Sequence, residues 1–185
     1  MDHAALILVD IQKAFDNPVW GERNNPDAEK KAGELLTWWR SMGGAVFHVR
    51  HLNDAPGSPF HPEGEGFEFK EEVLPISGEP IITKTVNSSF IGTDLEARLR
   101  EKGIHTAVIA GLTTPHCVST TARMSGNLGF RTYLIEDAAA AFALEDHQGR
   151  VVDPETVHSL SLATLHGEFA EIVTVDELKR QFGQS

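Results

Sequence analysis

The feature that most constrains the fold is a repeated alternation between short, continuous apolar runs and longer segments with helical spacing. The runs do not alternate between apolar and polar residues, which is typical of parallel strands buried on both faces. They occupy residues 5–9, 45–49, 80–83, 106–110, 131–135 and 171–174. The helical segments occupy residues 26–39, 93–102, 115–128, 153–166 and 175–182. This order predicts a doubly wound, three-layer α/β fold with helices on both faces of a parallel sheet.

The length of the chain indicates one domain with one long loop. A chain of 185 residues suits a single α/β domain over residues 1–185 better than two domains. Residues 52–78 are rich in glycine, proline and acidic residues, which predicts a loop with at most short ordered pieces. Because loops of this length are uncommon in compact domains unless they have a function, we expect this one to cover a site.

The charge balance narrows the kinds of partner. There are 27 acidic and 16 basic residues, for a formal net charge of −11, which argues against nucleic acid and against an anionic membrane surface. No apolar run approaches the roughly 20 residues needed to span a bilayer, and the first residues lack the pattern of a secretion signal. We therefore expect a cytoplasmic protein that acts on a small molecule, with no nucleic-acid or membrane partner.

Three polar residues follow predicted strands at the edge where open parallel sheets bind ligands. Asp10 follows the first strand, Lys84 the third, and Cys117 follows the fourth after a turn. Each also has a simpler interpretation, because Cys117 could be a small buried hydrophobe, Asp10 a turn cap and Lys84 a solvated lysine. The spacing alone does not fix the strand order, and so leaves open whether the three residues meet.

The surroundings of Cys117, the only cysteine in the chain, are compatible with a reactive thiol as well as with a core residue. Thr114 suits the N-cap of the following helix, and Pro115 suits its first position. Cys117 would then lie in the first helical turn, where unpaired N–H groups and the helix dipole favour an anion. We expect its pKa to fall from about 8.5 toward neutrality, and the same N–H groups to be able to bind an oxyanion.

Four segments of the chain are similar to those of a known enzyme family. They are residues 5–12 (ALILVDIQ), 83–95 (TKTVNSSFIGTDL), 108–118 (VIAGLTTPHCV) and 122–130 (ARMSGNLGF). With these segments in family order and spacing, the chain resembles the isochorismatase-like cysteine hydrolases from about residue 4 to residue 175. That family includes nicotinamidases, N-carbamoylsarcosine amidases and ureidoacrylate amidohydrolases.

The resemblance implies a site and a sheet order. Asp10, Lys84 and Cys117 would form a catalytic triad, in a six-stranded parallel sheet of order 3-2-1-4-5-6. A cis peptide bond between Leu112 and Thr113 would aim the Thr113 N–H, together with that of Cys117, at the oxyanion. The implied reaction is hydrolysis of a small amide, ureido or N-carbamoyl substrate through a thioester, with release of ammonia or an amine. The family also implies a homodimer or homotetramer.

The chain departs from the family pattern at the metal site of nicotinamidases. Those enzymes bind a metal through an Asp-x-His pair after the second strand, and this pair is absent here. The histidines of the region are His48, His51 and His61. We therefore predict no metal and no other cofactor, although these three residues leave a zinc site open.

The sequence is also compatible with two other functions. Hydrolysis of an isochorismate-like vinyl ether is the alternative within the family, although the presence of Cys117 favours amide hydrolysis. A non-catalytic thiol or redox protein is the alternative outside it.

The candidates for substrate binding are Phe15, Trp20, His51, Phe90 and His116, with Phe60 and Phe67 as further aromatic candidates.

Overall fold

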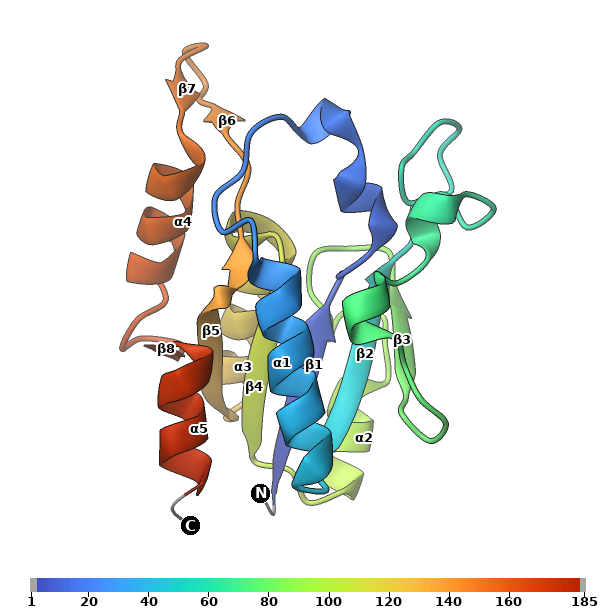
Figure 1. The fold of residues 1–185 in the computed structure, drawn as a ribbon, viewed down its shortest axis with the longest axis vertical. Helices are drawn as coiled ribbons and strands as arrows, with labels where there is room; N and C mark the ends of the chain where they lie inside the picture. Colours follow the sequence, from blue (N-terminus) through green and yellow to red (C-terminus); the bar gives the residue numbers. More distant parts are fainter. Residues whose placement is uncertain (1–2, 184–185) are drawn as a thin grey trace.

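The computed structural model describes residues 3–183, which form a six-stranded parallel sheet with helices on both faces (Figure 1). The strands of this sheet are β1 (Ala4–Val9), β2 (Ala45–His51), β3 (Ile81–Lys84), β4 (Thr106–Leu112), β5 (Arg131–Ala140) and β8 (Glu171–Val173). Their spatial order is β3-β2-β1-β4-β5-β8. The predicted fold class and strand order are therefore confirmed, with β8 as the sixth strand.

Five helices form the two outer layers. Helices α1 (Ala28–Ser41) and α5 (Val175–Gly183) cover one face of the sheet, in front of it in Figure 1. Helices α2 (Leu95–Glu101), α3 (Ser119–Asn127) and α4 (Pro154–Ala163) contribute to the core on the other face. Within residues 3–183, no helix has the length and apolar character needed to cross a membrane.

The apolar runs are continuous because each central strand is buried on both faces. In β1, Ile7 packs in the core below α2 and α3, while Leu6 and Leu8 pack in the core below α1 and α5. All six residues of β1 are buried. Burying a Leu or Ile side chain stabilises a fold by about 1.5–3 kcal/mol, so these alternating contacts hold β1 in register at the centre of the sheet.

The chain differs from the prediction mainly after β5. This strand continues to Ala140 rather than ending near residue 135, and its pairing with β4 shifts between Ile109 and Gly111. The short strands β6 (Leu144–Glu145) and β7 (Val151–Val152) then form a separate antiparallel hairpin, which the sequence pattern did not indicate. Two-residue strands carry too little periodicity to be recognised.

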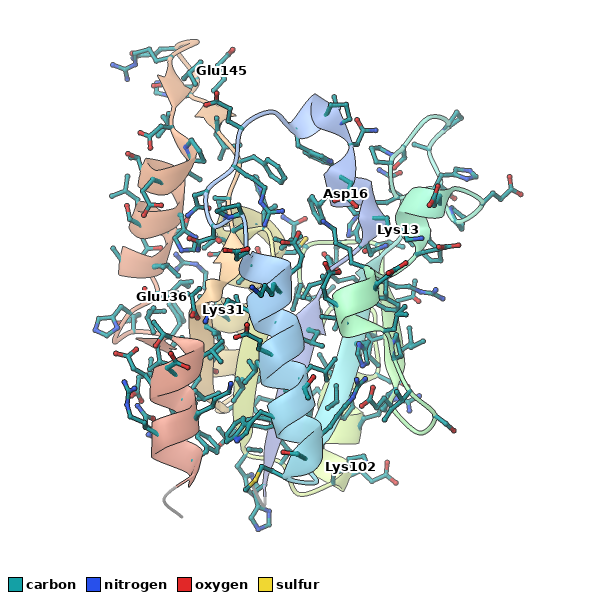
Figure 2. All side chains as sticks on the ribbon, viewed as in Figure 1. Lys13, Asp16, Lys31, Lys102, Glu136 and Glu145 are labelled. Atoms are coloured by element: carbon teal, nitrogen blue, oxygen red, sulfur yellow. The ribbon has the colours of Figure 1, made fainter. Side chains whose placement is uncertain are left out.

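The long loop has the predicted character. Between β2 and β3 it contains only two short 3₁₀ turns, Glu65–Phe67 and Glu71–Val73, and one bridge between Phe69 and Gln12. The segment after β1, which holds Lys13 and Asp16, lies beside it at one end of the molecule, and Lys102 marks the opposite end (Figure 2). The strands of the sheet point their carboxyl ends toward Lys13 and Asp16, so both loops border that edge.

Candidate active site

The sheet brings Asp10, Lys84 and Cys117 together. Asp10 directly follows β1, Lys84 is the last residue of β3, and Cys117 lies in a π turn, Thr114–Val118, between β4 and α3. The Lys84 Nζ donates to Asp10 Oδ2 at 2.7 Å and to Cys117 Sγ at 3.3 Å. Because β1 pairs with both β2 and β4, the ends of β1, β3 and β4 converge at the point where the strand order reverses.

Asp10 has an unusual backbone and an incompletely paired carboxylate. Its φ of +52° lies in the left-handed region, which Asp tolerates better than most residues. The side chain is 1% exposed, and its Oδ1 has no hydrogen-bond partner among residues 3–183. Burial raises the pKa of Asp10, and the charge and hydrogen bond of Lys84 offset this only in part. The unpartnered oxygen can therefore accept a proton.

The thiol of Cys117 differs from the expected thiolate. Burial and the adjacent Asp10 charge raise its pKa to about 12, against the lowering effect of Lys84. The expected fall of this pKa toward neutrality is thus wrong, because burial of Cys117 and the neighbouring carboxylate outweigh the effect of the helix terminus. The predicted capping is also wrong, since Thr113 is the N-cap and Thr114 the first residue of the turn. The Thr114 hydroxyl instead bonds to His158 Nδ1 at 2.8 Å.

Lys84 is fixed by three neighbours. Its side chain is fully buried, and its Nζ also lies 3.1 Å from Nδ1 of His51. Burial and the Lys84 charge lower the pKa of His51 to about 4, so this ring is neutral at neutral pH. Since the His51 Nδ1 accepts a hydrogen bond from the ammonium, the ring proton lies on Nε2. His51 therefore both positions Lys84 and offers an N–H donor.

Among residues 3–183, His48, His51 and His61 do not form a group that could hold a metal ion. His48 and His51 lie on opposite faces of β2, and His48 Nε2 bonds to Glu79 Oε2 at 2.7 Å. The side chains of Asp10, His51 and Cys117 do present ligand atoms within 4.8 Å of one another. The ammonium of Lys84 contacts all three, so a cation of the chain itself already lies among them.

The backbone before Cys117 brings N–H groups close to the thiol. The Leu112–Thr113 peptide bond is cis. Gly111 precedes it with a φ of +139°, and a Cβ at this position would overlap the carbonyl oxygen of Val9 in β1. Within residues 3–183, the Thr113 N–H makes no hydrogen bond to a loop or side-chain acceptor, and the Cys117 N–H makes none outside its own turn. The Thr113 N–H is therefore available to a ligand, and the Cys117 N–H lies in the first turn beside the thiol.

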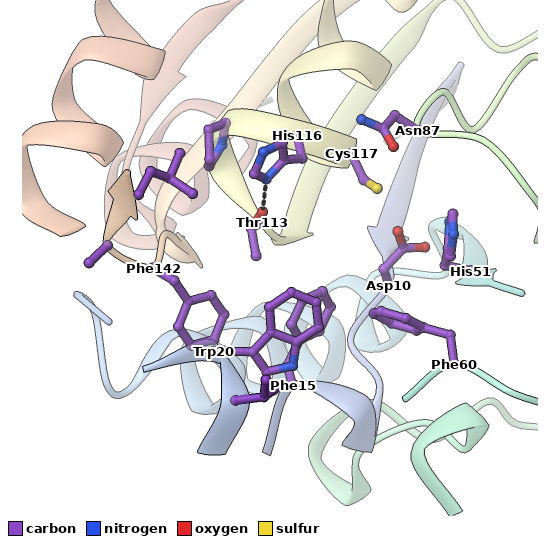
Figure 3. A pocket seen from close by; sticks show the side chains of 14 residues that line it. Asp10, Phe15, Trp20, His51, Phe60, Asn87, Thr113, His116, Cys117 and Phe142 are labelled. Atoms are coloured by element: carbon purple, nitrogen blue, oxygen red, sulfur yellow. Dashed lines mark hydrogen bonds between the residues drawn. The ribbon is translucent and has the colours of Figure 1, made fainter. Parts of the chain in front are cut away.

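A pocket of about 410 Å³ opens onto these groups (Figure 3). Four aromatic rings form its apolar wall, with neighbouring centroids 5.2 to 6.1 Å apart. These rings belong to Phe15, Trp20, Phe60 and Phe142. The Trp20 Nε1 donates to the carbonyl oxygen of Ala14 at 2.8 Å, so this ring presents no free donor. Polar groups lie on the opposite side, around Cys117.

Of the substrate-binding candidates, Phe15, Trp20, His51 and His116 line the pocket, as does Phe60. Phe90 does not, because it packs in the core with its ring stacked 6.0 Å from that of Phe130. Phe67 instead lies under the guanidinium of Arg50, 4.2 Å from the ring centroid. The sequence pattern did not indicate six further lining residues, which are Val19, Asn87, Pro115, Phe142, Ala143 and Leu144.

Gln12 is a second kind of missed residue, because it supports the site without lining it. Its fully buried side chain donates to the carbonyl oxygens of His51 and Phe67 at 3.1 Å, and accepts from the His51 N–H at 2.7 Å. It thus ties the end of β2 and the long loop to the segment after β1. The signal in the sequence was the amide side chain two residues after Asp10, because an amide that is buried there requires hydrogen-bond partners.

This chain is similar in sequence and structure to known proteins of one family. The model of the isochorismatase domain matches residues 4–177. The isochorismatase family protein YrdC of Bacillus subtilis is 58% identical over 178 residues, covering 96% of this chain and 95% of that protein. A crystal structure of an isochorismatase-family hydrolase from Chromobacterium violaceum superposes with a TM-score of 0.97 at 42% identity, covering 100% of this chain and 96% of that one. Maleamate amidohydrolase of Pseudomonas putida is 26% identical over 194 residues, covering 96% of this chain and 85% of that protein. The chain therefore belongs to the isochorismatase family of hydrolases.

Proposed function

We propose that this hydrolase is a cysteine-dependent amidohydrolase that cleaves a small amide through a thioester on Cys117. One observation carries the proposal: a buried thiol lies beside a carboxylate with an unpartnered oxygen, and both line a ligand-sized pocket. A thiol kept only for packing needs neither the adjacent carboxylate nor access to a pocket. The similarity to maleamate amidohydrolase supports C–N bond cleavage.

The first half of the reaction forms the thioester. Asp10 accepts the proton of the Cys117 thiol as the sulfur attacks the carbonyl carbon of the amide. The carbonyl oxygen becomes an oxyanion, for which the N–H groups of Thr113 and Cys117 are suitable donors. Lys84 stays protonated and holds Asp10 in place. The raised pKa of Asp10 suits this task, because a stronger acid would be a poorer base.

The second half releases the two products. Protonated Asp10 gives its proton to the leaving nitrogen, the C–N bond breaks, and ammonia or an amine departs. Asp10 then takes a proton from water as the water oxygen attacks the thioester carbon. The C–S bond breaks, the carboxylic acid leaves, and the proton returns to the sulfur. The net reaction consumes one water and leaves the protein unchanged.

The test is ammonia release from a panel of primary amides, ureido acids and N-carbamoyl compounds, with Cys117→Ala as the matched control. We expect turnover of at least one member by the natural protein and a loss of at least about 100-fold in the variant. Full turnover by Cys117→Ala would overturn the proposal. So would cleavage of an isochorismate-like vinyl ether by a protein that turns over no amide.

A further inference from the structure

The pocket has no free cation. Among residues 3–183, the lining includes no lysine or arginine, and Asp10 is its one carboxylate. Its two histidines are neutral at neutral pH, because burial and Lys84 lower the pKa of His51 to about 4 and partial burial also lowers that of His116. A ligand in this pocket therefore finds hydrogen-bond donors but no positive charge that it could reach.

Three cations that adjoin lining residues, Lys84, Arg23 and Lys13, are already paired with carboxylates. Lys84 is fully buried against Asp10, His51 and Cys117. The Arg23 guanidinium donates to both carboxylate oxygens of Glu29, at 2.7 and 2.8 Å. Lys13, on the segment that carries Phe15 (Figure 2), pairs with Glu68 at 2.7 Å and with Glu65 at 3.4 Å.

The polar and apolar groups are separated across the pocket. Donors and acceptors for an amide gather on one side, where Asn87, His51 and Cys117 lie in Figure 3. The rings of Phe15, Trp20 and Phe142 line the other side, while Phe60 packs edge-on against His51 with centroids 5.2 Å apart. Phe142, Phe15 and Phe60 are each less than 10% exposed. A substrate whose amide reaches Cys117 must therefore place its acyl group against Phe142, Phe15 and Trp20.

We propose, resting on the amidohydrolase function above, that the substrate is an uncharged amide with a planar apolar acyl group, and that amides with a carboxylate on the acyl group are excluded. A carboxylate in this pocket would lose its hydration without gaining a cation from the lining residues. Burying an unpaired carboxylate costs several kcal/mol in practice. The specificity-determining residues are Phe15, Trp20 and Phe142 together with Leu144 at the base of the β6–β7 hairpin.

A matched pair of substrates tests this exclusion. Isocrotonamide and maleamate have the same planar four-carbon skeleton, with a methyl group in the first where the second has a carboxylate. We expect kcat/KM for isocrotonamide to exceed that for maleamate by at least about 100-fold, and benzamide to be a better substrate than isocrotonamide. Equal or better turnover of maleamate, with loss in Cys117→Ala, would overturn the exclusion and leave the amidohydrolase function standing.

A charge added to the wall provides the converse test. Leu144→Arg supplies a guanidinium, and Leu144→Gln is a matched polar control without charge. We expect the ratio of kcat/KM for maleamate to that for isocrotonamide to rise at least about tenfold in Leu144→Arg, and to stay near its natural value in Leu144→Gln. An unchanged ratio in both variants would contradict the role given to the missing cation.

Binding separates failure of the specificity from failure of the chemistry. Calorimetry on Cys117→Ala, which holds substrate without turning it over, should show benzamide and isocrotonamide bound at least about 100-fold more tightly than maleamate. That result, with no turnover by the natural protein, would reject the amidohydrolase function and keep the pocket's preference. Binding of none of the three, or preferred binding of maleamate, would reject the preference itself.

Discussion

Among residues 3–183, two buried lysines pair with carboxylates, and the two pairs differ in what surrounds the acid. Lys70 donates to Glu29 at 2.7 Å and to Asp16 at 2.6 Å, and Arg23 binds both oxygens of Glu29. Lys84 donates to one oxygen of Asp10 and leaves the other unpartnered. Glu29 thus has two cations where Asp10 has one.

The difference appears in the acidities of the two carboxyl groups. Burial by itself raises the pKa of Glu29, but hydrogen bonds from Arg23 and Lys70 outweigh it and the net pKa is lowered. Burial also raises the pKa of Asp10, and there one lysine is not enough to reverse the effect. The first cluster therefore holds a permanent anion that ties α1 to the loops, and the second holds a carboxylate that can accept and return a proton.

The largest effect should come from removing the proton acceptor. We expect Asp10→Asn to lower kcat for amide hydrolysis by about 10³-fold, because general acid–base catalysis contributes about 10²–10⁴-fold. Asp16→Asn, the matched change at the Lys70 cluster, should keep kcat within about twofold, since Asp16 lies outside the pocket lining. Steady-state ammonia assays measure both, and similar losses in the two variants would break the comparison.

The free energy of unfolding should depend more on the Lys70 cluster than on the Lys84 cluster, the reverse of the order expected for kcat. Glu29→Gln leaves Arg23 and Lys70 short of a negative charge, and breaking a buried ion pair costs about 3 kcal/mol or more. Asp10→Asn should cost less, because burial already disfavours the charged form of Asp10. Urea unfolding of both variants measures this, and a larger loss for Asp10→Asn would contradict the account.

The thiol of Cys117 should report the charge of Asp10. Burial and then the charge of Asp10 raise the pKa of Cys117 to about 12, so Asp10→Asn should lower this pKa while burial continues to raise it. The absorbance of the thiolate near 240 nm, titrated against Cys117→Ala as a blank, measures the shift. An unchanged titration in Asp10→Asn would show that Asp10 does not act on the sulfur.

The smallest effect concerns the pH dependence of folding. Asp10, whose pKa is raised in the folded protein, binds its proton more tightly when folded, so its contribution to stability falls as pH rises from 3.8 through its folded pKa. Glu29, whose pKa is lowered, contributes stability that is present above 4.5 and is lost as pH falls through its folded pKa. Asp10→Asn should remove the loss of stability as pH rises, and Glu29→Gln should remove the loss of stability as pH falls. Unfolding at several pH values measures both.

The sequence predicts the part of the site that is carried by strands. Continuous apolar runs fix where β1, β3 and β4 end, so Asp10, Lys84 and Cys117 could be placed at one edge before the structure was known. Their meeting needed the strand order, which came from the family resemblance. The fold was therefore almost fully predictable, except for the extension of β5 and the β6–β7 hairpin.

The pocket wall was less predictable because it depends on contacts between distant loops. Phe142 follows the unpredicted end of β5, and Asn87 and Leu144 belong to segments with no periodic pattern. Phe90 was misplaced because an aromatic residue in a family motif can serve the core as well as a pocket. The direction of the Cys117 pKa was missed for a similar reason, since local sequence reports the helix terminus but not the burial or the Asp10 charge.

The most direct test of the central claim is the reaction of Asp10→Asn with p-nitrophenyl acetate. This ester has a leaving group that needs no proton, so Cys117 can be acylated without Asp10, whereas hydrolysis of the thioester still requires it. We predict a burst of about one nitrophenolate per protein and an acetyl group on Cys117 in the intact mass and peptide map, absent from Cys117→Ala. Steady turnover at the natural rate, or no acetyl group on Cys117, would contradict the account.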